Sequence, residues 1–186
     1  MLKLNLGCGQ NMMAGYVNVD KFDSFGADTV CDLEVVPWPF ESDSVEEVSM
    51  NHVMEHLGAD TDVFFGVMKE LYRVCADGAL VRIAVPHPRS EAYAGDPTHV
   101  RPINQHMLQL FSKKKNREWQ ENKSSNTPLA VYLDVDFEIV HLSYTLTPYW
   151  FQKYTQGELN DVDIEFAMRT HFDVADEIKI DLRAIK

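Results

Sequence analysis

The chain has 186 residues, 45% of them hydrophobic and 25% charged, which is typical of a globular domain with a buried core. Its formal net charge is −12, which disfavours a nucleic-acid partner, because such binding relies on Lys and Arg that neutralise phosphates. No apolar run approaches the roughly 20 residues of a membrane span, and the strand-like start leaves no room for a signal peptide. We expect a single cytoplasmic domain over residues 1–186, without a membrane partner.

The cysteines and the basic residues indicate no special site. Cys8, Cys31 and Cys75 lack the CxxC spacing of a zinc knuckle and form no disulfide framework, so we interpret them as reduced and structural. The one basic cluster, residues 113–117, is short. We interpret it as a solvated face, with a phosphate-binding patch as the less favoured alternative.

Apolar runs bounded by turn residues alternate with helical patterns, which predicts a parallel sheet with covering helices. Strands are expected at residues 2–6, 16–20, 28–31, 45–50, 79–85, 135–144 and 175–185. A helix should begin near Thr61 or Asp62 and end before Gly78, and another should cover residues 158–168. The last strand alternates polar and apolar residues, which places it at or near the sheet edge.

Residues 86–130 show a weaker pattern, rich in Gly, Pro, His and Asn. Connections of this length are uncommon without a functional reason. Ligands of open α/β sheets bind at loops that follow the carboxyl ends of the strands. We therefore predict that this stretch is an insertion of the domain that binds a ligand, which in a group-transfer enzyme would be the acceptor.

Three polar motifs follow successive strands. Gly7 and Gly9 come directly after the first strand, where glycine allows a tight turn and close approach of a ligand. Asp20 ends the second strand, where a carboxylate can accept hydrogen bonds from both ribose hydroxyls. Asp32 follows the third strand, with Leu33 beside it, and the pair could contact an adenine. Each motif alone also fits a simple turn or an exposed loop aspartate, so their order is what makes the set informative.

With these motifs the chain resembles the class I S-adenosylmethionine-dependent methyltransferases, especially small bacterial and phage members, over its whole length. Residues 4–9 are similar to the family's glycine motif, and the segment from Asn51 to Leu57 to the motif that lines the methionine end of the cofactor. The resemblance implies an α/β, Rossmann-like open sheet of about seven strands, mostly parallel with an antiparallel C-terminal edge strand, and helices on both faces. It also implies S-adenosyl-L-methionine as the cofactor. The implied cofactor-binding residues are Asn5, Gly7, Cys8, Gly9, Asp20, Lys21, Asp32, Leu33, Asn51 and His52.

Two departures from the family pattern stand out. Asn5 occupies a position that is usually acidic, so its contact to the amino group of the cofactor must be weaker or supplied elsewhere. The spacing from Gly9 to Asp20 is too short for the usual first helix. Residues 10–15 are therefore expected to form a loop or one helical turn, which leaves that side of the site more open.

Methyl transfer to a hydroxyl or amine requires a positioned nucleophile and removal of a proton, for which histidine is suited. Within residues 95–101 we predict His99 as the general base, Asp96 as the residue that orients it, and Arg101 as the acceptor-binding group. A loop held together by hydrogen bonds of Asp96 and His99 is an equal alternative. His52 should border the transfer centre.

Three further sites are weaker. Glu55 and His56 are interpreted as residues that cap or pack the next helix. A divalent metal on His87, Asp96 and His99 is a minor alternative, and no metal is predicted. The aromatic stretch 144–151 could wall an acceptor pocket, although a core or strand-end cluster is favoured.

The sequence therefore predicts a methyltransferase that acts on an oxygen or nitrogen of a small polar acceptor, such as a sugar or metabolite. Asn51–Met54 does not match the Asn/Asp-Pro-Pro-Tyr motif of DNA amino-methyltransferases. A protein substrate stays open, and the oligomeric state is not legible. The alternatives are an inactive cofactor-binding module with a regulatory role and an interaction domain that keeps only the fold.

Overall fold

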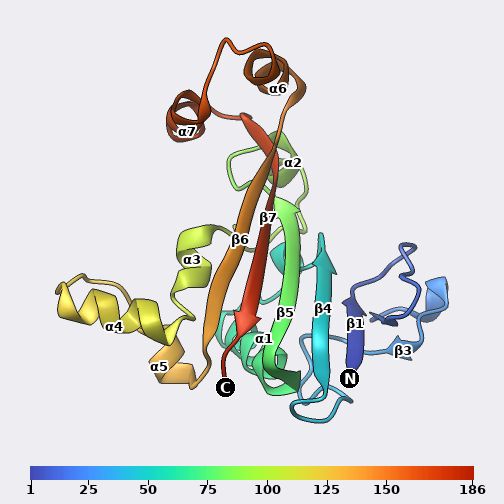
Figure 1. Cartoon of the computed structure of the whole chain (residues 1–186). Coiled ribbons are helices and arrows are strands. Elements are labelled where there is room, and N and C mark those ends of the chain that lie inside the picture. The colour runs from blue at the N-terminus through green and yellow to red at the C-terminus, as the bar shows by residue number, and fades with distance from the viewer.

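The computed structural model describes residues 1–186 and contains one seven-stranded sheet (Figure 1). The strands are β1 (Leu2–Leu6), β2 (Val17–Asp20), β3 (Thr29–Val30), β4 (Val45–Asn51), β5 (Cys75–Pro86), β6 (Phe137–Leu146) and β7 (Ala175–Ala184). Their order is β3-β2-β1-β4-β5-β7-β6, in which the first five are parallel and β7 is antiparallel to both neighbours. The predicted Rossmann-like sheet and its antiparallel C-terminal strand are confirmed. The edge position is a correction, because β6 pairs with the outer side of β7 and forms the edge itself.

The helical elements follow the strands unevenly. They are the 3-10 turns η1 (Asp23–Phe25) and η2 (Met54–His56) and the helices α1 (Thr61–Val74), α2 (Glu91–Ala94), α3 (Gln105–Gln109), α4 (Lys113–Glu121), α5 (Leu129–Leu133), α6 (Pro148–Thr155) and α7 (Asp161–Thr170). None of them combines the length and the apolar character that a membrane crossing requires. Residues 86–130, the predicted insertion, hold α2, α3, α4 and the loop between α2 and α3.

The longest helix, α1, shows how the sequence builds the core. The Asp60 side chain caps its first turn by accepting a hydrogen bond from the Asp62 backbone amide at 2.8 Å. Its apolar side chains recur at helical spacing and are buried against the sheet. The helix ends before Gly78, as predicted, but Gly78 is not the residue that stops it: the last helical residue is Val74, and Gly78 lies within β5.

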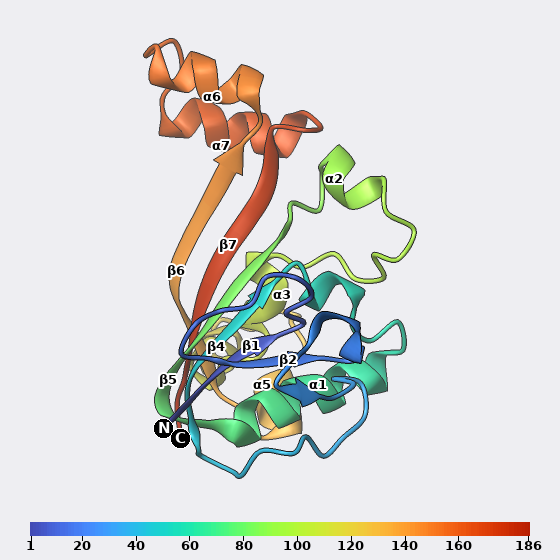
Figure 2. The ribbon, with the colours of Figure 1, turned by 90° about the vertical axis from the view of Figure 1, so that its right-hand side faces the viewer.

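The helices that pack against the sheet all lie on one of its faces. Alternate side chains of β1, β4, β5 and β7 are fully buried on that face, and they join α1 and α3 in a single apolar core. Figure 2 shows α1, α3 and α5 on one side of the strands and no helix on the other. The opposite side chains are mostly polar, and on this open face Glu47 bonds to Lys3 (3.1 Å), Tyr16 (2.7 Å) and Arg82 (2.8 Å).

The open face corrects the prediction of helices on both faces. The connections from β1 to β2 and from β2 to β3 span residues 7–16 and 21–28, and their only helical element is the three-residue η1. A crossover that includes a packing helix needs at least about 10–12 residues. Both connections are therefore loops. The short spacing after Gly9 predicted this for the connection from β1 to β2.

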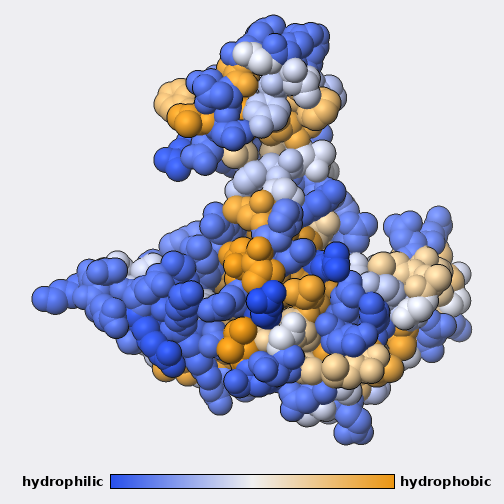
Figure 3. Space-filling view, in the orientation of Figure 1, coloured by the Kyte–Doolittle hydropathy of each residue, from blue (hydrophilic) through white to orange (hydrophobic).

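β6 and β7 extend beyond the other strands as a two-stranded arm that carries α6 and α7 at its far end (Figures 1 and 3). Residues 144–151 thus form the end of β6 and the start of α6, where Tyr149 and Phe151 are exposed. The stretch therefore lies at a strand end, where Tyr149 packs edge-on against Trp150, which agrees with the favoured interpretation as a strand-end cluster. The basic cluster lies in α4, where Lys113, Lys114 and Lys115 form ion pairs with acidic neighbours, as a solvated face would.

Candidate functional site

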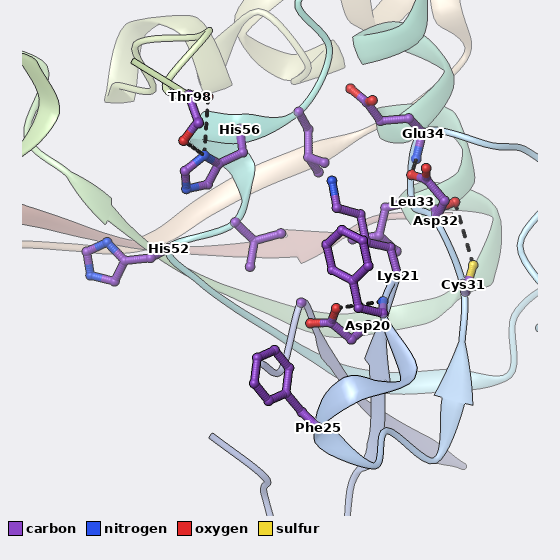
Figure 4. A pocket seen from close by; sticks show the side chains of 14 residues that line it. Asp20, Lys21, Phe25, Cys31, Asp32, Leu33, Glu34, His52, His56 and Thr98 are labelled. Carbon is purple, nitrogen blue, oxygen red and sulfur yellow. Dashed lines mark hydrogen bonds between the residues drawn. The ribbon is translucent and has the colours of Figure 1, made fainter. Parts of the chain in front are cut away.

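A cavity of about 430 Å³ lies at the carboxyl ends of β1, β2, β3 and β4, within the size range of small-molecule sites. It gathers residues from all three strand-end motifs and from the segment after β4 (Figure 4). The lining residues are Gly7, Asp20, Lys21, Phe22, Phe25, Cys31, Asp32, Leu33, Glu34, His52, Val53, His56, Leu57 and Thr98. Six of the residues expected to bind the cofactor are among them: Gly7, Asp20, Lys21, Asp32, Leu33 and His52.

The turn after β1 favours glycine at position 7, because its backbone is left-handed and there is no space for a side chain. Its φ is +66°, in the left-handed region, and a Cβ built on it would lie 2.5 Å from Val53 Cγ2. Gly9 also has a positive φ, +47°, but the space around it is open. The first glycine therefore lets the β1 turn pack against the segment that follows β4.

Asp20 is held by backbone amides of two loops, the one after β1 and the one after β2. Its Oδ2 accepts a hydrogen bond from the Gly9 amide at 2.9 Å, and its Oδ1 accepts one from the Phe22 amide at 3.0 Å. Each carboxylate oxygen has a second lone pair for a ligand. The carboxylate is half-buried, so it is held in place and still accessible.

The third motif, with Asp32, Leu33 and the neighbouring Glu34, forms another part of the cavity wall. Asp32 Oδ1 accepts a hydrogen bond from the Glu34 amide at 3.0 Å, and Glu34 in turn accepts one from Gly58 at 2.7 Å. Leu33 is buried and supplies an apolar surface. Phe22 and Phe25 are exposed aromatic side chains that also line the cavity, and Lys21 Nζ lies 5.1 Å from the Phe22 ring centroid.

Four predicted cofactor residues lie outside the cavity lining. Asn5 is buried and donates hydrogen bonds to the Asn11 carbonyl (2.8 Å) and to Asn18 Oδ1 (2.9 Å), which hold the loop after β1. Cys8 is buried, and Gly9 contacts Asp20 through its amide. Asn51 lies with Asn5 along a second, shallower depression on the open face. The structure gives these residues roles in shaping the site, and their contact with a cofactor stays a prediction.

Imidazole groups line the end of the cavity away from Asp20 (Figure 4). His52 Nε2 lies 3.0 Å from Glu177 Oε2, and Nδ1 lies 3.4 Å from Glu55 Oε1. The carboxylate of Glu55, aided by Glu177 and opposed by partial burial, raises the pKa of His52. His56 Nδ1 contacts Thr98 through its hydroxyl (3.0 Å) and its carbonyl (3.2 Å).

The three residues predicted to act on the acceptor do not converge on one point. His99 Nε2 lies 3.7 Å from Asp96 Oδ2, an ion-pair distance. The His99 side chain is 7% exposed and lies next to the His56 ring, with 4.7 Å between the centroids, and it does not line the cavity. The Arg101 guanidinium stacks 4.3 Å above the Phe64 ring and bonds to the Gly58 carbonyl. The position of Arg101 suits a structural role, and the catalytic roles of all three stay predictions.

Sequence reasoning missed how the turn after β4 meets the loop before α3. The backbone amides of Val100 and Arg101 both donate to the Glu55 carbonyl, at 2.9 and 3.1 Å. This contact brings Glu55, His56 and His99 together, whereas His87 is placed elsewhere, against Tyr144. No local pattern could have shown a contact between segments more than 40 residues apart.

No protein-family model and no curated protein sequence matches the chain. Solved structures do. A SAM-dependent methyltransferase from Archaeoglobus fulgidus is similar with a TM-score of 0.62 and 16% identity, over 97% of this chain and 85% of its own. A methyltransferase from Mesorhizobium loti gives 0.51 and 15% over 98% and 90%. The 1,6-didemethyltoxoflavin-N1-methyltransferase of Burkholderia thailandensis gives 0.53 and 9% over 100% and 71%. The chain therefore has the fold of the class I S-adenosylmethionine-dependent methyltransferases, as its motifs predicted.

Proposed function

We propose that this protein is a methyltransferase that binds S-adenosylmethionine in the cavity at the strand ends. The observation that carries the proposal is the convergence of Gly7, Asp20 and Asp32 on that one cavity. These residues belong to three different strand-end motifs, and each is predicted as a cofactor residue from the sequence alone. The similar solved structures support the fold, and the lining residues support the ligand.

The residues present fit the nucleoside part of this cofactor. Asp20 keeps free lone pairs for two ribose hydroxyls, since each of its oxygens accepts one backbone amide. Asp32 Oδ2 accepts no hydrogen bond from the protein, so it can accept one from an adenine amino group. Leu33 and the exposed ring of Phe25 offer apolar surface for the base. The carboxylates also suit a ligand that carries a positive sulfonium.

The acceptor would bind at the imidazole end of the cavity. The cofactor supplies a methyl group on a sulfonium for in-line displacement, and the protein must hold the acceptor atom and take its proton. The hydroxyl of Thr98 donates to Asp96 at 2.6 Å, so it must accept from His56 Nδ1–H, which leaves the Nε2 lone pair of a neutral His56 free. His56 can therefore act as the base for an acceptor at this end of the cavity, and the His99 ring lies beside it.

The acceptor class follows from the charge and lining of this region. A net charge of −12 works against nucleic acid, and imidazole, hydroxyl and carboxylate groups suit a small molecule that forms hydrogen bonds. We therefore propose transfer to an oxygen or nitrogen of a small polar acceptor, such as a sugar or another metabolite.

Calorimetric titration of the purified chain with S-adenosylmethionine and S-adenosylhomocysteine tests the proposal. We expect binding of both, and a 10- to 100-fold loss of affinity in Asp20→Asn, which corresponds to about 1.4–2.7 kcal/mol for hydrogen bonds to a charged group. Asp23→Asn, an exposed acid on η1 that does not line the cavity, is the matched control and should bind normally. Absence of binding in a folded protein, or equal affinities of the two variants, would remove the cofactor from this cavity.

A further inference from the structure

The side chain of Glu55 is buried without the partners that a carboxylate requires. It is 0% exposed, and neither Oε1 nor Oε2 accepts a hydrogen bond from the protein. An unpaired buried carboxylate is strongly unfavourable, so such groups are protonated, paired with a cation or bound to a metal. No cation is hydrogen-bonded to Glu55, and its ion-pair contacts are the imidazoles of His52 (3.4 Å) and His56 (4.0 Å).

Two histidines present a free nitrogen to this carboxylate. His56 Nδ1 is held by the Thr98 hydroxyl and carbonyl, and His56 Nε2 lies 4.0 Å from Glu55 Oε1. His99 Nδ1 lies 2.8 Å from the Tyr93 carbonyl, which can only accept, so Nδ1 must donate the proton. Both rings are thus fixed in the tautomer that leaves the Nε2 lone pair available. Metal-bound histidines are typically oriented in this way, with the second ring nitrogen donating to an oxygen.

The spacing of the three groups is close to that of a metal site. One ligand atom from each of Glu55, His56 and His99 lies within 4.8 Å of the other two. Zinc bonds of 2.0–2.2 Å in a tetrahedron place ligand atoms about 3.3–3.6 Å apart, so side-chain movements of about 1–1.5 Å would close the site. Asp96 Oδ2 lies 3.7 Å from His99 Nε2 and accepts no hydrogen bond, which makes it available at the rim.

The alternative cation for Glu55 is the imidazolium of His52. Its Nδ1 lies 3.4 Å from Oε1, but the contact does not satisfy the geometry of a hydrogen bond, and Oε2 is left without a partner. The other ring nitrogen of His52 is taken by Glu177. His52 therefore offsets part of the charge and leaves the second oxygen of Glu55 unused.

We propose that Glu55, His56 and His99 bind one divalent d-block cation of the zinc class. Two imidazoles and one carboxylate are a ligand set that such ions accept while keeping a position open. His56 also lines the cavity, so the open position would face the acceptor end. There the ion would lower the pKa of an acceptor hydroxyl and take over the task assigned to a base. This last role rests on the proposed methyltransferase function, whereas the metal site itself does not.

The test uses the full chain, stripped with a chelator and titrated with Zn²⁺ by calorimetry and with Co²⁺ by visible absorption. We expect one equivalent of Zn²⁺, the absorption of a four- or five-coordinate Co²⁺ site, and affinities at least about 100-fold weaker in Glu55→Gln and His56→Ala. His106→Ala, which removes an exposed histidine on α3, is the matched control and should bind as the unmodified chain does. Circular dichroism checks that each variant is folded.

Two results would overturn the site: no stoichiometric binding by the folded chain, or binding that Glu55→Gln and His56→Ala leave unchanged. Glu55→Gln keeps the shape of the side chain and removes its charge, so this variant is expected to fold even where a larger change does not. Titration of the metal-free protein with S-adenosylhomocysteine distinguishes the metal site from the proposed methyltransferase function. Cofactor binding without metal binding would refute the metal site alone, and metal binding without cofactor binding would refute the proposed function alone.

Discussion

The contact between Gly7 and Val53 predicts that the two glycines of the β1 turn respond differently to the same substitution. Alanine at either position must adopt a left-handed conformation, which costs about 1–2 kcal/mol. At Gly7 the new Cβ also meets Val53 Cγ2 at 2.5 Å and Cγ1 at 3.0 Å, and overpacking of this kind costs about 1–3 kcal/mol more. We expect Gly7→Ala to lower the free energy of unfolding by about 2–5 kcal/mol and Gly9→Ala by about 1–2 kcal/mol.

Urea unfolding followed by circular dichroism measures both values, provided that the m-values are unchanged. The clash itself is isolated by a double-mutant cycle with Val53→Ala, which alone should cost about 1.6 kcal/mol for two buried methyl groups. In the double variant Gly7→Ala/Val53→Ala the clash is absent, so the two changes should cost about 1–3 kcal/mol less than their sum. Equal effects of the two glycine substitutions, or a coupling below about 0.3 kcal/mol, would refute this account of Gly7.

Two further predictions concern single side chains. Glu70 accepts hydrogen bonds from the Trp38 amide (2.7 Å) and from Arg73 (2.8 Å to each oxygen), and the Arg73 contact lowers its pKa. Glu70→Gln should therefore cost about 1–3 kcal/mol in urea unfolding near pH 7, and the difference from the unmodified chain should shrink as the pH falls below 4.5 through the depressed pKa. Cys31 lines the cavity, and burial raises its pKa above the usual 9.0, so iodoacetamide should modify it slowly at neutral pH and faster toward pH 9 and above. S-adenosylhomocysteine should protect Cys31 from modification, which peptide mass spectrometry measures. Cys75 is the internal control, because burial raises its pKa to about 12 and should leave it unmodified throughout. Equal labelling of Cys31 with and without the ligand would argue against the cavity assignment.

The half of the site that the sequence predicted is the half built from strand ends. Gly7, Asp20 and Asp32 each follow an apolar run directly, and the carboxyl ends of parallel strands share one edge of the sheet. Because of that rule, the three strand-end motifs are expected to form a single site. The cavity contains all three residues, so this part of the prediction needed no knowledge of loop conformation.

The other half depends on loops, and there the sequence was insufficient. The approach of His99 to Glu55 is set by backbone hydrogen bonds between two irregular segments, which no periodicity encodes. The sequence predicts that Glu55 caps or packs the next helix, because nothing in its neighbours shows that its carboxylate is fully buried beside two histidines. Helix α6 was missed although Pro148 stands at its first turn, a position that favours helix starts, because the aromatic residues after it resemble a strand end.

The open face of the sheet has a thermodynamic consequence. A domain of 186 residues with average burial has a heat capacity of unfolding of about 2.2–2.8 kcal/mol/K. That quantity grows with the apolar area that unfolding exposes, and here one side of the sheet carries no helix and mostly polar side chains in the native state. We expect a value below this range in scanning calorimetry, together with a flatter dependence of stability on temperature. The loss of helices from one face would then make the protein less sensitive to both cooling and warming around its temperature of maximum stability.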